Sequence, residues 1–215
     1  MNQMETAQNV AITRYPTPLR ASFQLSKEEK EEAIAFHFAK IMESLGLDLN
    51  HPSLAETPKR VAKMYVEELF YGLDYSQFPN VSFIENDFFE EQGNLILIKD
   101  ISLKSVCEHH FIPMTGIAHI AYVPSGKILG LSKLNRIVDY FARRPQLQER
   151  LNAQIADCIS QLLETDDVAV AVEAKHFCIC YRGIQDSTSL TQTHVLRGSF
   201  KTDPTLRSEF FKNIS

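Results

Sequence analysis

The sequence predicts an α+β fold in which a mostly antiparallel sheet has its helices grouped on one side. Two observations predict it. Between residues 26 and 72 apolar residues recur at helical spacing, and from about Leu95 onward the pattern changes to strand-like runs separated by turn residues. No internal repeat, low-complexity tract or Gly/Ser linker divides the 215 residues. We therefore expect a mobile arm at 1–25 and a single domain at 26–215, with a helical part at 26–72 and a core from about 95 to 215.

Two helices are predicted in the helical part. The first begins after Ser26, because Ser26 and Glu29 form a capping-box pattern, and it ends near Gly46. The second begins at Thr57-Pro58, with Thr57 as the expected cap and Pro58 at the first helical position, and ends at Gly72. The apolar stripes are Ile34, Phe38, Ile41 and Leu45 in the first helix, and Val61, Met64, Tyr65 and Leu69 in the second.

The core is predicted to mix strands and helices. The strand-like runs are Leu95–Ile101, Ile117–Val123, Ile128–Leu131, Val168–Ala174 and His176–Tyr181. Ser132 is expected to cap a helix whose inward face is Leu134, Ile137, Val138 and Phe141. Pro145 is expected to begin another helix, and Asp203-Pro204 a short C-terminal one.

Composition and charge exclude several classes of function. The chain has 22 Lys and Arg against 27 Asp and Glu, a net charge of −5 that disfavours binding to nucleic acid through phosphates. No apolar run approaches the roughly 18–20 residues that span a bilayer, and the first residues lack the apolar core of a secretory signal. We expect a cytoplasmic protein with no membrane partner. In such a compartment, cysteines near histidines indicate metal binding or catalysis before disulfides.

Cysteines and histidines gather in two short stretches. Cys107-Glu108-His109-His110 supplies a thiolate and two imidazoles, and Cys-x-x-His suits two zinc ligands on one tight turn. The second stretch runs from His176 to Cys180, where a strand would point His176, Cys178 and Cys180 to one side and Phe177, Ile179 and Tyr181 into the core. Spacing leaves open which of the first three completes a metal site. The additional histidines favour a catalytic metal over a structural one.

Two further groups suggest binding of a charged ligand. Lys133 and Arg136 share one face near a helix N-terminus, which suits a phosphate, although a solvated helix face is the simpler interpretation of these two alone. Arg182 would add a third cation if its segment met theirs. Gln148 and Glu149 lie early in the helix after Pro145, where a carboxylate commonly serves the helix dipole but can also accept two N–H groups from a guanine edge.

Four separated motifs together resemble the GTP cyclohydrolase I family. They are Ser105-Val106-Cys107-Glu108-His109-His110-Phe111, Gly130 to Val138, Arg144 to Leu151, and His176-Phe177-Cys178 through Arg182-Gly183. The resemblance runs from about Ser26 to the C-terminus. It implies the tunnelling fold, in which the sheets of several subunits join into a barrel ringed by helices. It also implies a homodecamer of two pentameric rings with active sites at subunit interfaces.

The resemblance also implies roles for individual residues. Cys107, His110 and Cys178 match the zinc ligands, one ion per subunit, which leaves Cys180 in the core. His109 matches the acid–base residue beside the purine imidazole ring, and His176 and Ser132 match residues near the ribose. Gln148 and Glu149 match the guanine-reading pair. Lys133, Arg136 and Arg182 match the triphosphate clamp. Arg60 and Lys63 of a neighbouring subunit are expected to add phosphate contacts. Gln185 and the stretch Leu190–Arg197 depart from the family's pattern without touching a matched site residue.

The reaction so implied is zinc-dependent hydrolysis of the imidazole ring of GTP, which releases formate and forms 7,8-dihydroneopterin triphosphate for folate or pterin biosynthesis. Three other interpretations compete with it. A zinc-stabilised binding module would hold nucleotide without turnover, and would not need His109 and His176. A nitrile reductase of the same fold would use a nucleophilic cysteine and no zinc. A related cyclohydrolase would stop at a different product.

Overall fold

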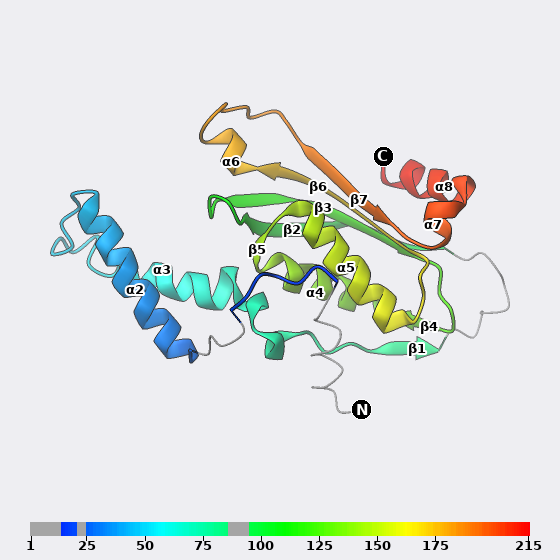
Figure 1. The fold of residues 1–215 in the computed structure, drawn as a ribbon, viewed down its shortest axis with the longest axis horizontal. Coiled ribbons are helices and arrows are strands. Elements are labelled where there is room, and N and C mark those ends of the chain that lie inside the picture. Colours follow the sequence, from blue (N-terminus) through cyan, green and yellow to red (C-terminus); the bar gives the residue numbers. More distant parts are fainter. Residues whose placement is uncertain (1–13, 21–24, 86–94) are drawn as a thin grey trace.

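The structure is a computed structural model, and it describes residues 14–20, 25–85 and 95–215. It is an α+β arrangement, as predicted, with a long curled sheet and helices packed against it (Figure 1). The α-helices are α2 (Lys27–Ser44), α3 (Thr57–Lys63), α4 (Leu131–Ala142), α5 (Gln148–Leu163), α6 (Phe177–Cys180), α7 (Ser199–Thr202) and α8 (Pro204–Ile214). Shorter helical segments are η1 (Met64–Leu69), η2 (Tyr71–Leu73) and η3 (Tyr75–Gln77). The strands are β1 (Phe83–Glu85), β2 (Ile96–Cys107), β3 (Pro113–Tyr122), β4 (Lys127–Leu129), β5 (Pro145–Gln146), β6 (Val168–His176) and β7 (Thr191–Leu196).

The main sheet has the strand order β5-β2-β3-β6-β7, and β1 pairs with β4 in a separate two-stranded sheet. All neighbours are antiparallel except β2 and β5. The expected strands Leu95–Ile101 and Ile117–Val123 are therefore confirmed but too short. A bulge between Ile98 and Ile101 hides the length of β2 from the alternation pattern, because it reverses which side chains face the core.

The two faces of the sheet are covered by different helices. On one face, alternate residues of β3 and β6 pack against the apolar sides of α4 and α5 in the main hydrophobic core. On the other face Ala121, Ala169 and Ala171 pack against Phe200 of α7 and Phe210 of α8. The predicted grouping of helices on one side thus describes α4 and α5, whereas α7 and α8 lie over the opposite face (Figure 1).

Two of the predicted helix starts are confirmed and three need correction. Ser26 and Glu29 form the expected capping box at α2, and Asp203 caps α8 through the N–H groups of Thr205 and Leu206. α4 instead has Gly130 as its N-cap, so that Ser132 lies exposed inside the first turn. α3 has Glu56 as its N-cap rather than Thr57.

The helix expected to begin at Pro145 begins at Gln148. Pro145 and Gln146 form β5, which pairs with Val106 and Cys107 at the end of β2. Because proline fixes only its own φ, and that value also suits an extended strand at a sheet edge, Pro145 alone did not identify a helix start. The prediction that Gly72 ends a helix is also wrong, because η1 ends at Leu69 and Gly72 lies inside η2. A Cβ at Gly72 would lie 2.1 Å from the Tyr140 carbonyl oxygen, so glycine is required there by close packing on α4.

The expected strand His176–Tyr181 is wrong. β6 ends at His176, which lies opposite Met114 near the start of β3. Beyond that point the neighbouring strand ends, so the chain satisfies its own backbone as the helical turn α6, with the Tyr181 N–H donating to the Phe177 carbonyl at 2.9 Å. Tyr181 is 75% exposed and therefore not in the core, and Cys180 is only half-buried.

The predicted mobile arm falls mostly on residues 1–13 and 21–24, which lie outside the described residues. Residues 14–20 run along α5 (Figure 1). The Arg14 N–H donates to Asp157 at 2.9 Å, and Gln154 donates to the Tyr15 carbonyl at 2.8 Å. Among the described helices, none has the length and apolar character needed to cross a lipid bilayer.

Candidate metal centre and active site

The turn between β2 and β3 carries Cys107 and His110. Cys107 ends β2, where its N–H donates to the Ile112 carbonyl and its carbonyl accepts from the Phe111 N–H, both at 2.9 Å. Phe111 adopts a φ of 53°, which closes the turn. Cys107 is buried, whereas His110 is exposed. The expectation that Cys-x-x-His occupies one tight turn is confirmed.

Cys178 reaches this turn through the topology of the sheet. β2 and β6 both run antiparallel to β3, so their carboxyl ends lie at the same end of the sheet. The turn α6 then brings Cys178 close, and the ligand atoms of Cys107, His110 and Cys178 all lie within 4.8 Å of one another. Of the three candidates that spacing left open, Cys178 is the one that joins the donor group. No other group of three or more such donors meets this distance among the described residues.

The donor group fits a zinc ion. Tetrahedral zinc with thiolate and imidazole ligands holds its ligand atoms roughly 3.5–3.8 Å apart, so the three side chains need only a small inward adjustment. Without a cation, burial raises the pKa of the Cys178 thiol, and the neighbouring Cys107 raises it further. A metal ion would oppose both effects, because it stabilises the thiolates that bind it. Three protein ligands are typical of a catalytic rather than a closed structural site.

Two further histidines lie beside the donor group. The ring of His109 is exposed, with its centroid 6.4 Å from that of His110. His176 is half-buried, and its Nε2 lies 2.7 Å from Oε1 of Gln148. Burial lowers the pKa of His176, while the charge of Glu149 opposes that shift. Both predicted acid–base histidines are thus at the same end of the sheet as Cys107 and Cys178.

The first turn of α5 brings Gln148 and Glu149 to this end. Gln146 pairs with Cys107 at the end of β2, and α5 begins two residues after Gln146. Gln148 is 2% exposed, and its amide nitrogen lies within hydrogen-bonding distance of acceptors on β6 and β7. Glu149 is exposed. The two residues of the predicted pair therefore differ in exposure to solvent, and a ligand entering from solvent would reach the Glu149 carboxylate before the Gln148 amide.

Two arginines hold this end together. Arg182 donates from Nη1 to Nε2 of His110 at 2.7 Å, which brings the third predicted cation next to a ligand residue. Arg150 makes a bidentate pair with Glu108, at 2.6 and 3.1 Å, and so ties the Cys107–His110 turn to α5. This pair is not among the residues predicted from the sequence. Its only signal there is that Glu108 and Arg150 lie in two different motifs.

The predicted residues on α4 lie apart from the donor group. Ser105 donates to the Ala142 carbonyl at 2.6 Å, so the end of α4, not its beginning, lies beside the end of β2. Ser132 is ten residues before Ala142, which at the helical rise places it about 15 Å along the axis. Lys133 and Arg136 lie nine and six residues before Ala142, which places them about 14 and 9 Å along the same axis. Within one chain, therefore, both cations are separated along α4 from the end of β2, where Arg182 contacts His110.

The last two candidates lie on α3. Arg60 and Lys63 are both exposed, and the Lys63 ammonium lies 3.7 Å from the carboxylate of Glu67. They belong to the helical part that extends away from the sheet (Figure 1). Their predicted contact with phosphate involves a neighbouring subunit, so it stays a prediction.

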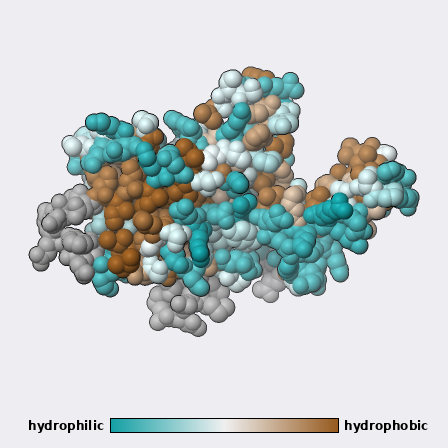
Figure 2. All heavy atoms as spheres, turned by 180° about the vertical axis from the view of Figure 1, so that it is seen from behind, coloured by the Kyte–Doolittle hydropathy of each residue, from teal (hydrophilic) through white to brown (hydrophobic). Residues whose placement is uncertain are grey.

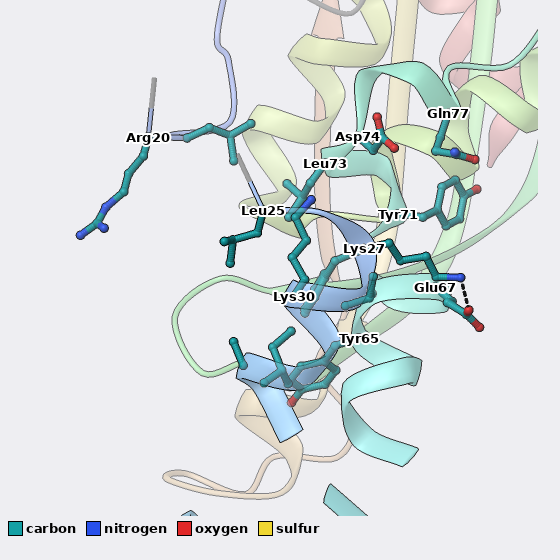
Figure 3. A pocket seen from close by; sticks show the side chains of 15 residues that line it. Arg20, Leu25, Lys27, Lys30, Tyr65, Glu67, Tyr71, Leu73, Asp74 and Gln77 are labelled. Atoms are coloured by element: carbon teal, nitrogen blue, oxygen red, sulfur yellow. Dashed lines mark ion pairs between the residues drawn. The ribbon is translucent and has the colours of Figure 1, made fainter. Parts of the chain in front are cut away.

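A pocket of about 650 Å³ lies between α2 and the segment from η1 to η3 (Figure 3). Lys27 and Glu67 form an ion pair at its side, and the remaining lining includes Leu25, Ile34 and Tyr65. None of the predicted metal, catalytic or substrate-binding residues lines it. The pocket therefore lies apart from the predicted site, and the concentration of ligand and acid–base groups directs attention to the end of the sheet instead.

Comparisons with known proteins agree with the motifs. The sequence model of a family described as GTP cyclohydrolase I matches residues 34–215. A protein of Aeromonas salmonicida named GTP cyclohydrolase 1 is 56% identical over 198 residues, which cover 92% of this chain and 89% of that protein. Proteins of the same name from Vibrio campbellii and Vibrio cholerae are 50% and 48% identical, each over 92% of this chain and 90% of their own length.

Proposed function

The chain belongs to the GTP cyclohydrolase I family, a family of enzymes, and from this premise we propose that it hydrolyses the imidazole ring of GTP. The proposed products are formate and 7,8-dihydroneopterin triphosphate, the first step of folate or pterin biosynthesis. The observation that carries the proposal is the convergence of Cys107, His110 and Cys178 within 4.8 Å of one another, with His109 and His176 beside them. The proposal includes action in the cytoplasm, without nucleic acid or membrane partners.

We propose one zinc ion per chain, held by Cys107, His110 and Cys178. When bound, the ion would supply the Lewis acidity that makes hydroxide available near neutral pH. A guanidinium only donates, so Nε2 of His110 uses its lone pair in accepting from Arg182. If Nε2 held the ion instead, Arg182 would be displaced and its charge would be free for a phosphate.

The histidines supply proton transfer in this proposal. C8 of the purine is a weak electrophile, and His109 would protonate the neighbouring ring nitrogen so that water can attack this carbon. After ring opening and loss of formate, the ribose must rearrange and close onto the amine. His176 and Ser132 would move protons at that stage. The exposure of His109 and the partial burial of His176 suit a ring-facing and a sugar-facing role.

Recognition of the substrate is assigned to charged residues. Glu149 would accept two N–H groups of the guanine edge, with Gln148 beside it. Lys133, Arg136 and Arg182 would bind the triphosphate, a tetra-anion that a chain of net charge −5 can hold only where cations are concentrated. These contacts lie away from C8, so their binding energy serves positioning over several steps.

The separation of about 15 Å along α4 supports a homo-oligomer in which one copy supplies the donor group and another supplies Ser132, Lys133 and Arg136. Exposed apolar surface supports it further. Large apolar side chains stand exposed at Phe36, Ile41 and Leu45 on α2, at Ile84 and Leu131 near β4, and at Tyr181 and Ile184 around α6. Figure 2 shows a broad apolar area over the end of the molecule that carries β1 and β4. We propose the decamer of joined sheets, with sites between copies.

The proposal is tested by mixing the purified protein with GTP, assaying formate, following pterin absorbance and measuring zinc. We expect stoichiometric formate and pterin, and about one zinc per chain. Bound nucleotide and metal without formate would establish the binding module instead. Activity on a nitrile in metal-free protein would establish the reductase, and formate with a non-pterin product the divergent cyclohydrolase.

A further inference from the structure

Gln148 is held by a network that uses every polar atom of its side chain. It is the first residue of α5 and is 2% exposed. Its Nε2 lies 3.1 Å from the Val172 carbonyl oxygen, 2.9 Å from the Thr191 carbonyl oxygen and 2.9 Å from Oγ1 of Thr193. Because an amide nitrogen carries two hydrogens, both are used and one is shared.

These acceptors determine which position of the Gln148 amide is Nε2 and which is Oε1. If the oxygen took the place of the nitrogen, it would face two carbonyl oxygens inside the protein with no hydrogen between these acceptors. Oε1 of Gln148 therefore points to His176, whose Nε2 lies 2.7 Å away. An amide oxygen only accepts, so Nε2 of His176 donates and carries a hydrogen.

From this geometry we infer that Gln148 is a positioning residue for His176. It holds the imidazole with Nε2–H toward α5 and leaves Nδ1 as the ring nitrogen that can accept a proton from a bound ligand. The kinetic part of this inference rests on the proposed function. The inference also gives the two predicted guanine-reading residues different roles. The polar atoms of Gln148 already have partners inside the protein, whereas the carboxylate of Glu149 is exposed and can contact a ligand.

The tautomer can be measured in the folded chain without substrate. Labelling with 15N-histidine gives ring-nitrogen signals for the seven histidines, and the His176 signals are identified by their loss in His176→Asn. At a pH well above the ordinary histidine pKa, we expect Nε2 of His176 to give the signal of a protonated nitrogen and Nδ1 that of a bare one. A proton on Nδ1 in the unaltered protein would overturn the inference.

Gln148→Met removes the acceptor at similar volume. We expect a mixture of His176 tautomers and a fall in kcat of about 10- to 100-fold, with the KM for GTP within about twofold. Gln154→Met is the matched control, because Gln154 is equally buried in α5 but donates to the Tyr15 carbonyl and Thr17 instead. It should leave the His176 signals and kcat unchanged. Unchanged His176 signals in Gln148→Met, or a raised KM with normal kcat, would contradict the positioning role.

If Gln148→Met does not fold, the tautomer measured in the unaltered protein carries the test, because the bond to the acceptor Oε1 requires the hydrogen on Nε2 of His176. A proton on Nδ1 there refutes the inference. The two proposals fail separately. If the His176 signals are as expected but no formate is released, the proposed function alone is refuted. If formate release is normal but the His176 signals are the same in Gln148→Met as in the unaltered protein, the positioning role alone is refuted.

Discussion

The end of the sheet at which β2 and β6 terminate and the first turn of α4 both carry residues expected to act on one substrate. The two regions differ in how far a single chain assembles them. At the sheet end, four segments converge, and the side chains of Cys107 and Gln148 are buried while that of Cys178 is half-buried. The first turn of α4 leaves Ser132 exposed about 15 Å away, measured along the helix. On the proposed function, one chain would complete the metal-binding half of a site and present the anion-binding half to a neighbour.

The largest effect is expected from Cys107→Ser, which breaks the metal-binding half directly. Loss of one thiolate ligand should remove zinc from the purified protein and reduce formate release by about 1,000-fold or more. Metal analysis and a formate assay measure the two. Cys180→Ser is the matched control, since Cys180 lies outside the donor group and should keep both. Normal turnover in zinc-free Cys107→Ser would remove the metal from the mechanism.

The next effect in size is expected from Lys133→Ala, which tests the other half. Loss of one charge-assisted contact to phosphate should raise the KM for GTP about 10- to 100-fold, with zinc content unchanged. Steady-state kinetics at fixed ionic strength measure this. Lys201→Ala, an exposed lysine on α7, should leave KM unaltered. An equal KM in Lys133→Ala and the unaltered protein would exclude Lys133 from the triphosphate site.

A smaller effect is expected from Arg150→Gln. This variant tests whether the pair between Arg150 and Glu108 holds the metal-binding half in place. This change breaks the bidentate pair with Glu108 and loosens the turn that carries Cys107 and His110. We expect zinc affinity to fall about 10-fold, as for other residues that orient metal ligands. Competition with a chelator measures it. Unaltered zinc affinity would mean that the β2–β3 turn holds its shape without α5.

The smallest effect is expected from Asp203→Ala, at the start of a helix that covers the opposite face of the sheet from α4 and α5. Loss of the cap on α8 should lower the free energy of unfolding by about 1 kcal/mol and leave kcat, KM and zinc content as they are. Denaturant unfolding beside steady-state kinetics separates these quantities. A change in KM at constant stability would show that the C-terminal helices communicate with the site.

Local signals in the sequence predicted what depends on local structure. The capping box at Ser26, the cap at Asp203 and the tight turn from Cys107 to His110 all depend on residues a few positions apart. The α+β class followed from the change in apolar period. Family motifs then singled out Cys178 as the third member of the donor group, which alternation along a strand could not do.

Nonlocal features defeated the same reasoning. The strand expected at His176–Tyr181 stops because its partner β3 begins at Pro113, which the sequence around Cys178 does not encode. β7 was missed because Thr191–Leu196 alternates weakly and gains its strand character from pairing with β6. The partners of Gln148 lie on two other strands, so its role was invisible from its neighbours in sequence.

The claim that one site takes its halves from two chains is tested most directly by complementation. One variant carries Cys107→Ser, which destroys the metal-binding half, and the other carries Lys133→Glu with Arg136→Glu, which destroys the anion-binding half. Each should be inactive alone. Mixed oligomers formed by co-expression should recover roughly a quarter of the unaltered activity, because one in four random pairings unites two intact halves. Mixed oligomers as inactive as either parent would contradict the claim.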